Sequence, residues 1–262
     1  MKVCVFIPCH ICYVEQISLL DRCLNSLINQ TIIPDIYVSI SLNDEFKKLF
    51  SYILRKYSEL VTFIFSKAQL YQMEHIYKLT KYADKYDIIM FCDDDDYYHK
   101  ERVEIFIKSY MNSNLEMKDL GGVKELDPES YDEYWCYGLV PKILFNFFDI
   151  FEKQNMLELL KHKFSDMYFR NYLVTRVDIN KSFGYIGITL DNHLYIYNNN
   201  NSNSITRSLN NTSTEEQIES NLIMKTICCE NDNKFNDIIS QISINEKQIF
   251  TTIYNFCKIL YL

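Results

Sequence analysis

Four consecutive aspartates, Asp93 to Asp96, directly follow the apolar run from Ile88 to Cys92. A run of this kind is typical of a buried strand, and carboxylates at its end repel one another unless a cation neutralises them. In an extended segment, Asp93 and Asp95 would point to the same side. Two carboxylates on one side, with other positions left to water and phosphate, suit Mg²⁺ or Mn²⁺. The sequence therefore predicts a divalent metal site at Asp93 and Asp95; the alternative is a solvated acidic turn or helix start.

The elements that must position these aspartates alternate between strand and helix signals. Short continuous apolar runs predict strands, and apolar positions that recur every three to four residues predict helices. The expected strands are residues 3–7, 36–42, 61–65 and 87–92, and the expected helices are residues 20–28, 46–57, 69–83 and a segment that begins near Lys100. This alternation favours a mostly parallel sheet, whose ligands bind beyond the carboxyl ends of the strands. Asp44 and the four aspartates both fall at that edge.

The second half of the sequence is less regular. Gly121-Gly122 and Asp127-Pro128 predict loops. Helices are expected at residues 143–151 and 156–160, a short strand at 194–197, and a low-complexity Asn/Ser loop at 198–203. Residues 215–262 predict a helical tail with one apolar stripe: Phe250, Ile253, Tyr254, Cys257 and Leu260. We interpret the stripe as packing, with peripheral membrane docking as the alternative.

Composition narrows the class of protein. The chain has 262 residues, a formal net charge of −8 and no basic stripe, which argues against a nucleic-acid partner. Its nine cysteines are irregularly spaced and several lie in apolar runs, as in a reduced cytoplasmic protein. We expect no transmembrane segment, and we interpret the first residues as a buried strand rather than a signal peptide. The expected division is a domain at 1–212, with halves 1–112 and 113–212, and a helical extension at 213–262 packed on it.

Several stretches, taken in order, resemble the family 2 glycosyltransferases of GT-A fold. These stretches are Val3 to Pro8, Cys23 to Thr31 with Pro34, Ile36 to Asp44, Phe91 to Asp96 with Arg102, and Tyr195 to Tyr197 with Ser204 to Thr206. The resemblance spans about residues 3 to 207. It implies a Rossmann-like, mostly parallel sheet flanked by helices, with a nucleotide-binding half followed by an acceptor half.

The same resemblance implies a donor and the residues that bind it. The donor would be a nucleoside-diphosphate sugar, with a UDP-sugar favoured, and the metal would be Mn²⁺ or Mg²⁺. Asp93 would lie near the ribose. Asp93 and Asp95 would share the metal, and the metal would bridge the diphosphate. The remaining donor-binding candidates are Pro8, Cys9, His10, Asp44, Lys67, Gln72 and Asp94. The acceptor would be a glycan, a protein or a lipid-linked group.

The resemblance also implies a carboxylate base for an inverting, hexosyltransferase-like reaction. Asp166 is the best match, although Ser165 stands where the family has a Glu; Asp178 and Asp191 are rivals, and a helix-capping role for Asp166 is the alternative. Tyr134, Trp135 and Tyr137 fall in the segment expected to bind the acceptor, where they would stack on a sugar or pack in the core.

Other classes of protein share part of this pattern. A haloacid-type phosphatase has its paired aspartates after the first strand, whereas these follow the fourth. A sugar nucleotidyltransferase commonly carries a glycine-rich loop after the first strand, and Pro8-Cys9-His10-Ile11 is not such a loop. A catalytically inert nucleotide-binding module of the same fold remains open, and Ser165 is its best support.

Overall fold

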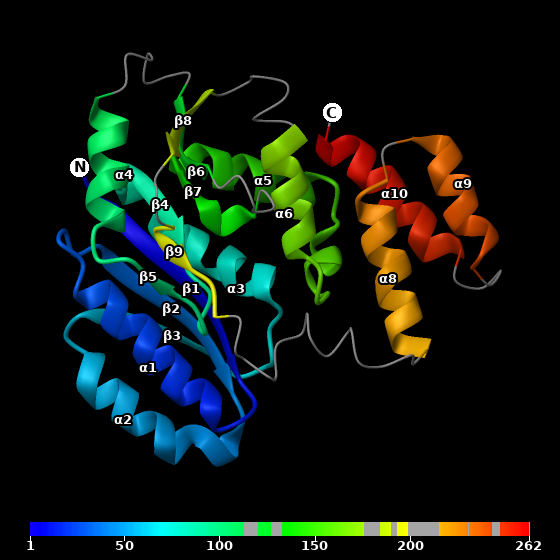
Figure 1. Ribbon diagram of the computed structural model, residues 1–262. Coiled ribbons are helices and arrows are strands. Elements are labelled where there is room, and N and C mark those ends of the chain that lie inside the picture. The colour runs from blue at the N-terminus through cyan, green and yellow to red at the C-terminus, as the bar shows by residue number, and fades with distance from the viewer. Residues whose placement is uncertain are drawn as a thin grey trace.

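The computed structural model describes residues 1–112, 120–126, 133–175, 184–189, 193–198, 215–229, 231–242 and 247–261. Its main element is a seven-stranded sheet in the order β3-β2-β1-β4-β7-β6-β8 (Figure 1). The strands are β1 (Val3–Ile11), β2 (Asp35–Leu42), β3 (Val61–Ser66), β4 (Ile88–Phe91), β6 (Leu120–Leu126), β7 (Tyr137–Leu139) and β8 (Gly184–Thr189). Only β7 runs antiparallel to its neighbours among these described strands. The predicted α/β class with a mostly parallel sheet is confirmed.

Helices cover both faces of the sheet. The helices are α1 (Glu15–Ile28), α2 (Lys47–Tyr57), α3 (Gln72–Leu79), α4 (Arg102–Met111), α5 (Pro141–Lys153), α6 (Asp166–Tyr172), α8 (Glu215–Ile227), α9 (Asp232–Ser240) and α10 (Lys247–Tyr261). One apolar core lies between the sheet and α1, α2 and α4. A second core lies on the opposite face, where α3, α5 and α6 pack and the C-terminal helices join them (Figure 1). Strand side chains alternate between the two cores, so both faces of the central strands are apolar.

Strand β1 is longer than its apolar run predicts. It continues through Pro8 to Ile11, and Pro8 lies opposite Ser39 of β2. Proline lacks the backbone N–H with which a residue of a central strand bonds to a neighbouring strand. However, β4 pairs with β1 only as far as Phe6, so Pro8 lies where β1 has β2 as its neighbour on one side. Pro8, Cys9 and His10 therefore belong to a strand, and the expectation that the strand ends before Pro8 is wrong.

The glycines predicted to form a loop at 121–122 lie instead inside β6. A register shift separates Leu120 from Gly122, and Gly122 has φ +143°. A Cβ atom there would lie 2.0 Å from the carbonyl oxygen of Gly138 in β7. Gly122 therefore allows β6 and β7 to pair closely at a bulge, which explains why a loop signal occurs within a strand. Asp127 and Pro128 lie outside the described residues.

The C-terminal helices pack on the second core. All five residues of the predicted stripe on α10 are buried, against α6, α8 and α9 among others. The stripe is therefore a packing surface and is not open to a lipid surface. Over the described residues, no helix combines the length and apolar character needed to cross a bilayer.

A two-stranded antiparallel ribbon lies beside the main sheet. It joins β5 (Tyr97–Tyr98) to β9 (Tyr195–Ile196). β5 directly follows the four aspartates. Its pairing with β9 therefore places Tyr195 and Ile196 near the carboxyl end of β4. The predicted short strand at 194–197 is confirmed at Tyr195–Ile196.

Candidate active site

The aspartate row, Asp93 to Asp96, follows β4 at the carboxyl edge of the parallel strands, as predicted. The row is not extended, because the N–H of Asp96 donates to the carbonyl of Asp93 at 3.2 Å and the chain turns at Asp94 and Asp95. Arg22 of α1 holds this turn by donating to the carbonyl of Asp95 at 2.7 Å. The expectation that this segment is extended is therefore wrong. Contacts from distant segments bend the row.

Asp93 leans toward the face of the sheet that α3 covers. Its Oδ1 accepts hydrogen bonds from the amide of Gln72, at 2.8 Å, and from the hydroxyl of Tyr134. The Gln72 amide also donates to the Tyr134 hydroxyl at 2.7 Å. The backbone N–H of Asp93 donates to the hydroxyl of Tyr195 at 3.1 Å. Sequence reasoning selected Gln72 but assigned neither tyrosine to this aspartate.

Asp94 and Asp96 have different environments. The Cys9 thiol of β1 hydrogen-bonds to the Asp94 carboxylate, on the face of the sheet that α1 covers. Asp96 is fully buried, and its two oxygens accept from the Tyr195 hydroxyl at 2.7 Å and from the backbone N–H of Asn198 at 2.7 Å. Asp96 therefore fastens β9 and the residues after it to the row, a structural role that the sequence did not indicate.

The row is a concentration of poorly compensated negative charge. Burial, together with repulsion from neighbouring carboxylates, raises the pKa of Asp93 to about 7 and that of Asp94 and Asp96 to about 8. Among the described residues, no ion pair joins a cationic side chain to these three aspartates. Hard carboxylate oxygens without a cationic partner suit a divalent cation such as Mg²⁺ or Mn²⁺.

The same residues do not form a complete protein cage for a metal. The described part of the chain holds no cluster of three or more His, Cys, Asp or Glu side chains arranged as a metal site. Mg²⁺ commonly binds through one or two carboxylates, with water and substrate phosphates completing its shell. The row fits that kind of site.

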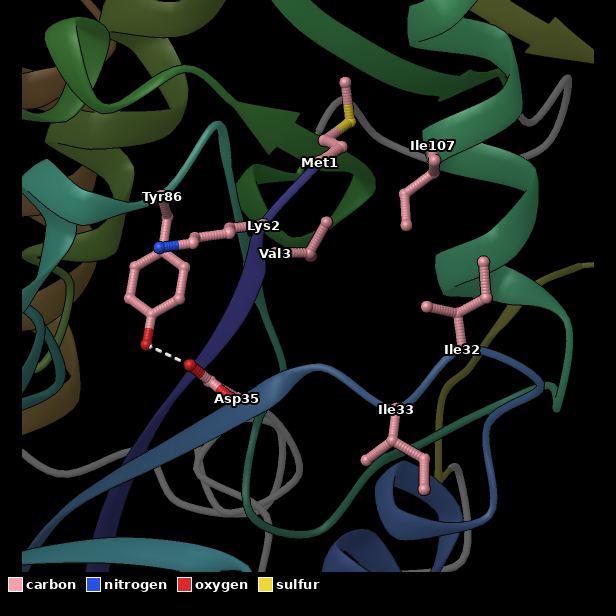
Figure 2. Close-up of a pocket in the computed structure, with 8 residues that line it drawn as sticks. All are labelled: Met1, Lys2, Val3, Ile32, Ile33, Asp35, Tyr86 and Ile107. Atoms are coloured by element: carbon pink, nitrogen blue, oxygen red, sulfur yellow. Dashed lines mark hydrogen bonds between the residues drawn. The ribbon is translucent and has the colours of Figure 1, made fainter.

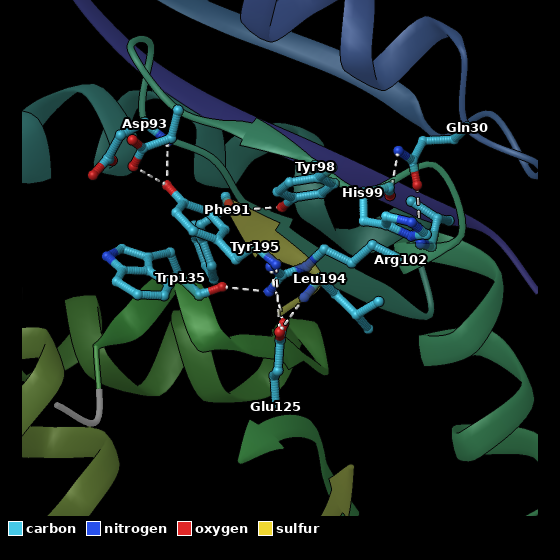
Figure 3. Close-up of polar contacts among 12 residues, drawn as sticks. Gln30, Phe91, Asp93, Tyr98, His99, Arg102, Glu125, Trp135, Leu194 and Tyr195 are labelled. Atoms are coloured by element: carbon cyan, nitrogen blue, oxygen red, sulfur yellow. Dashed lines mark hydrogen bonds and ion pairs between the residues drawn. The ribbon is translucent and has the colours of Figure 1, made fainter. Parts of the chain in front are cut away.

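A buried ion pair fixes the surroundings of the row (Figure 3). Arg102 of α4 is fully buried and lies 3.1 Å from Glu125 of β6. Glu125 Oε1 accepts from the backbone N–H groups of Leu194 and Tyr195, at 2.6 and 3.3 Å. Arg102 also donates to the Trp135 carbonyl at 2.8 Å. This pair therefore ties α4, β6 and β9 together and holds Tyr195 beneath the row.

Aromatic rings complete that support. The Arg102 guanidinium lies over the rings of Tyr98 and Tyr195, at 4.5 and 4.9 Å from their centroids. Tyr195 stacks on Trp135 with a centroid distance of 4.1 Å. Tyr134 and Tyr137 are buried in the core, whereas Trp135 is half-buried. Of the three aromatics expected near the acceptor, Tyr134 contacts the row directly and Trp135 contacts it through Tyr195.

Asp166, the predicted base, is the first residue of α6. Its Oδ1 is buried without a hydrogen-bond partner among the described residues. Burial, with repulsion from Glu133 and Asp93, raises the pKa of Asp166 to about 7, although N–H groups at the helix start lower it in part. The structure thus brings Asp166 near Glu133, which directly precedes Tyr134, and near Asp93. Ser165 is fully buried, and Asp178 and Asp191 lie outside the described residues.

The other donor-binding candidates differ in how closely they approach the row. Pro8 and Cys9 are buried in β1, and His10 is half-buried at the end of that strand. Asp44 follows β2 at the same sheet edge, but its side chain is 90% exposed and pairs with Lys47 at 2.6 Å. Lys67 is exposed just after β3. Gln72 and Cys9 contact the row, whereas among the described residues no hydrogen bond or ion pair joins Asp44 or Lys67 to it. The roles of all these candidates in binding stay predictions.

A pocket at the opposite end of the sheet is separate from this site (Figure 2). Its lining includes Lys2, Val3, Asp35 and Tyr86, which lie where β1, β2 and β4 begin. The Tyr86 hydroxyl donates to Asp35 there at 2.6 Å. Because ligands of parallel sheets bind at the carboxyl ends of strands, this pocket is not the candidate active site.

Comparisons with known proteins agree with this geometry. The sequence profile described as "Glycosyl transferase family 2" matches residues 4–117, a segment that contains the aspartate row. No curated protein matches the chain.

Solved structures share the fold at low sequence identity. S. aureus TarS 1-349 in complex with UDP is 13% identical, with a TM-score of 0.53, and the match covers 98% of this chain and 80% of that one. TarS 1-349 without a named ligand is 15% identical, with a TM-score of 0.52, over 100% of this chain and 81% of that one. This chain therefore shares the fold of these TarS structures, and its sequence match to the family 2 profile covers residues 4–117.

Proposed function

We propose that this protein transfers a sugar from a nucleoside-diphosphate sugar to an acceptor hydroxyl, with inversion, assisted by a divalent metal. The proposal is supported by two acidic groups that influence each other, because repulsion from Asp93 contributes to the raised pKa of Asp166. The aspartate row supplies one of them, and Asp166 supplies the other from a helix about 70 residues further along the chain. The family profile includes the row, and TarS, which shares the fold, was solved with UDP.

Asp95 and Asp93 would hold Mn²⁺ or Mg²⁺ together with the donor diphosphate. When bound, the metal supplies stabilisation of the negative charge that develops on the leaving nucleotide. Gln72 and Tyr134 fix the Asp93 carboxylate from the side of α3, while Tyr195 fixes its backbone. These contacts orient the carboxylate before the donor binds, which lowers the cost of ordering it.

Asp166 would remove the proton from the attacking acceptor hydroxyl. A general base needs a free oxygen lone pair, and the buried Oδ1 of Asp166 has no partner among the described residues. A base near neutral pKa also accepts a proton without holding it too tightly, and burial moves Asp166 in that direction. Direct attack on the sugar carbon opposite the leaving diphosphate inverts the configuration at that carbon.

Turnover with water in place of the acceptor tests this proposal. UDP-sugars incubated with the protein and Mn²⁺ should release UDP. The Asp166→Asn variant should still bind the donor but release UDP about 10²- to 10⁴-fold more slowly. Asp149→Asn is the matched control, because Asp149 is exposed on α5 and pairs only with Lys153 of the same helix among described residues.

Either of two results would refute this proposal and identify a different function. Release of pyrophosphate from a sugar phosphate and a nucleoside triphosphate would identify a nucleotidyltransferase. Binding of UDP without turnover of any UDP- or GDP-sugar would identify an inert nucleotide-binding module.

A further inference from the structure

Three buried polar residues lie on the α3 side of the sheet near the carboxyl ends of β1 and β2. His75 of α3 is 1% exposed, and Ser39 and Ser41 of β2 are 0% and 2% exposed. Side chains alternate along β2, so both serines face α3 between apolar neighbours that face the other core. Burying a histidine and two hydroxyls is costly unless every polar atom is satisfied. No step of the proposed reaction uses this group.

Hydrogen bonds join the three residues to His10 in a single chain. Ser39 Oγ lies 2.8 Å from His75 Nδ1, and His75 Nε2 lies 3.2 Å from Ser41 Oγ. Ser41 Oγ then lies 2.8 Å from His10 Nδ1. The backbone N–H of Leu70 also donates to Ser41 Oγ, at 3.4 Å. Of the four side chains joined by these hydrogen bonds, Ser39, Ser41 and His75 are buried and His10 is half-buried.

Ser39, at the buried end of this series of hydrogen bonds, determines which atom donates in each of them. In the described part of the protein, the sole partner of Ser39 Oγ is His75 Nδ1. A fully buried hydroxyl that cannot donate loses its hydrogen bond to water without replacement. Ser39 therefore donates to His75 Nδ1, and this leaves the ring proton of His75 on Nε2. The opposite direction would strand the Ser39 proton, which disfavours it by about tenfold or more.

The remaining bonds follow from the first. His75 Nε2–H donates to Ser41 Oγ, which also accepts from Leu70, so both acceptor positions of that hydroxyl are used. Ser41 must then donate its proton to His10 Nδ1. His75 stays neutral throughout, since burial and the nearby His10 and Lys78 lower its pKa to about 3.

We infer that Ser39, His75 and Ser41 are positioning residues that hold His10 as its Nε2–H tautomer, so that His10 donates a hydrogen bond to an acceptor oxygen of the bound nucleotide. This inference rests on the proposed function for the identity of the ligand. No side chain of the described residues bonds to Nε2, and His10 lies one residue before the end of β1, at the sheet edge where parallel sheets bind ligands. The buried chain thus sets the polarity of a binding group at the surface.

The first test reads the tautomers directly in the unliganded protein. Long-range ¹H–¹⁵N spectra of the histidine rings at pH 8 separate pyrrole-type from pyridine-type nitrogens, and His10→Gln and His75→Gln variants assign the signals. Both rings should carry the proton on Nε2. A proton on Nδ1 of either ring would overturn the inferred direction, whether or not the protein binds a nucleotide.

The second test measures what the tautomer does for binding. Ser41→Ala should give a mixed His10 tautomer and weaken UDP binding in the presence of Mn²⁺ by about two- to tenfold, the effect of one hydrogen bond. Ser41→Thr keeps the hydroxyl and should restore both the tautomer and the affinity. Ser51→Ala, on the exposed side of α2, is the control variant.

The nucleotide part of the inference has its own outcomes. Uridine and inorganic pyrophosphate tested separately with Ser41→Ala show whether the affected oxygen belongs to the nucleoside or to the diphosphate. UDP affinity that is unchanged in Ser41→Ala, while the His10 tautomer is mixed, would overturn the role in binding. Absence of UDP binding by the wild-type protein would instead refute the proposed function and leave the tautomer assignment standing.

Discussion

Replacing Arg102 by methionine should destabilise the protein severely, because Glu125 would keep a buried charge without its partner. Arg102 is 0% exposed, the Glu125 side chain is 7% exposed, and the two lie 3.1 Å apart. Removing one member of such a pair costs about 3–5 kcal/mol. The lost hydrogen bond to the Trp135 carbonyl adds about 1 kcal/mol. A domain with an unfolding free energy of about 5–15 kcal/mol would lose a large part of it.

A second substitution should recover most of that loss. In Arg102→Met/Glu125→Gln the buried charge is gone, and the Gln side-chain oxygen still accepts from Leu194 and Tyr195. We expect the double variant to be more stable than Arg102→Met by about 2 kcal/mol or more, since apolar replacement of a whole buried pair is often neutral.

Urea unfolding followed by circular dichroism measures these free energies. Lys153→Met is the control, because its i,i+4 pair with Asp149 is exposed and should contribute less than about 1 kcal/mol. A loss below about 1 kcal/mol in Arg102→Met would refute the claim that this pair anchors β9 to the sheet. Additive losses in the double variant would refute the explanation by an uncompensated charge.

Two further predictions concern the site itself. Tyr195→Phe keeps the stacked ring but removes the hydroxyl that bonds to Asp93 and Asp96, so the free energy of unfolding in urea should fall by about 2–4 kcal/mol. Tyr52→Phe is the control, because Tyr52 is exposed. An unchanged stability of Tyr195→Phe would contradict this prediction. Because burial raises the pKa of Asp166 to about 7 and a base must be deprotonated, the donor turnover rate should rise with pH up to about 7 and then level off. A rate that is flat between pH 5 and pH 8 would count against Asp166 as the base.

The sequence predicted the first half of the fold well because the signals there are local. Strands β1 and β4 contain continuous apolar runs, β2 and β3 are mostly apolar, and the helices between them keep regular apolar spacing. The strands β6, β7 and β8 were not predicted. β6 contains two glycines and the buried charges Lys124 and Glu125, and β7 has three residues, so neither has the pattern of a buried strand.

The site was predictable in its location and not in its detail. The position of the aspartate row after β4 follows from the sequence alone, since the apolar run and the acids are adjacent. The bend in the row depends on Arg22 and Tyr195, which lie 73 and 102 residues from their partners in the chain. A single sequence carries no signal for such pairs. The Tyr195-Ile196-Tyr197 stretch indicated a strand but not that its first hydroxyl bonds to the row.

The helical regions show the same distinction between local and tertiary causes. The helix expected at 69–83 begins at Gln72, and from Thr80 to Lys85 it continues as a 3₁₀ helix. The segment at 156–160 forms one 3₁₀ turn at Leu157–Leu160. Apolar spacing indicates helical structure in both places, but tertiary packing decides where the regular α-helix ends.

The central claim is that the aspartate row binds a divalent ion and, through it, a diphosphate. Calorimetric titration of the wild-type protein and of Asp95→Ala with UDP, each with and without Mn²⁺, tests it most directly, with circular dichroism to verify the fold. We expect wild-type binding that requires Mn²⁺, and its loss in the folded Asp95→Ala variant. Equal UDP affinity in both proteins, or wild-type affinity that ignores Mn²⁺, would contradict the claim.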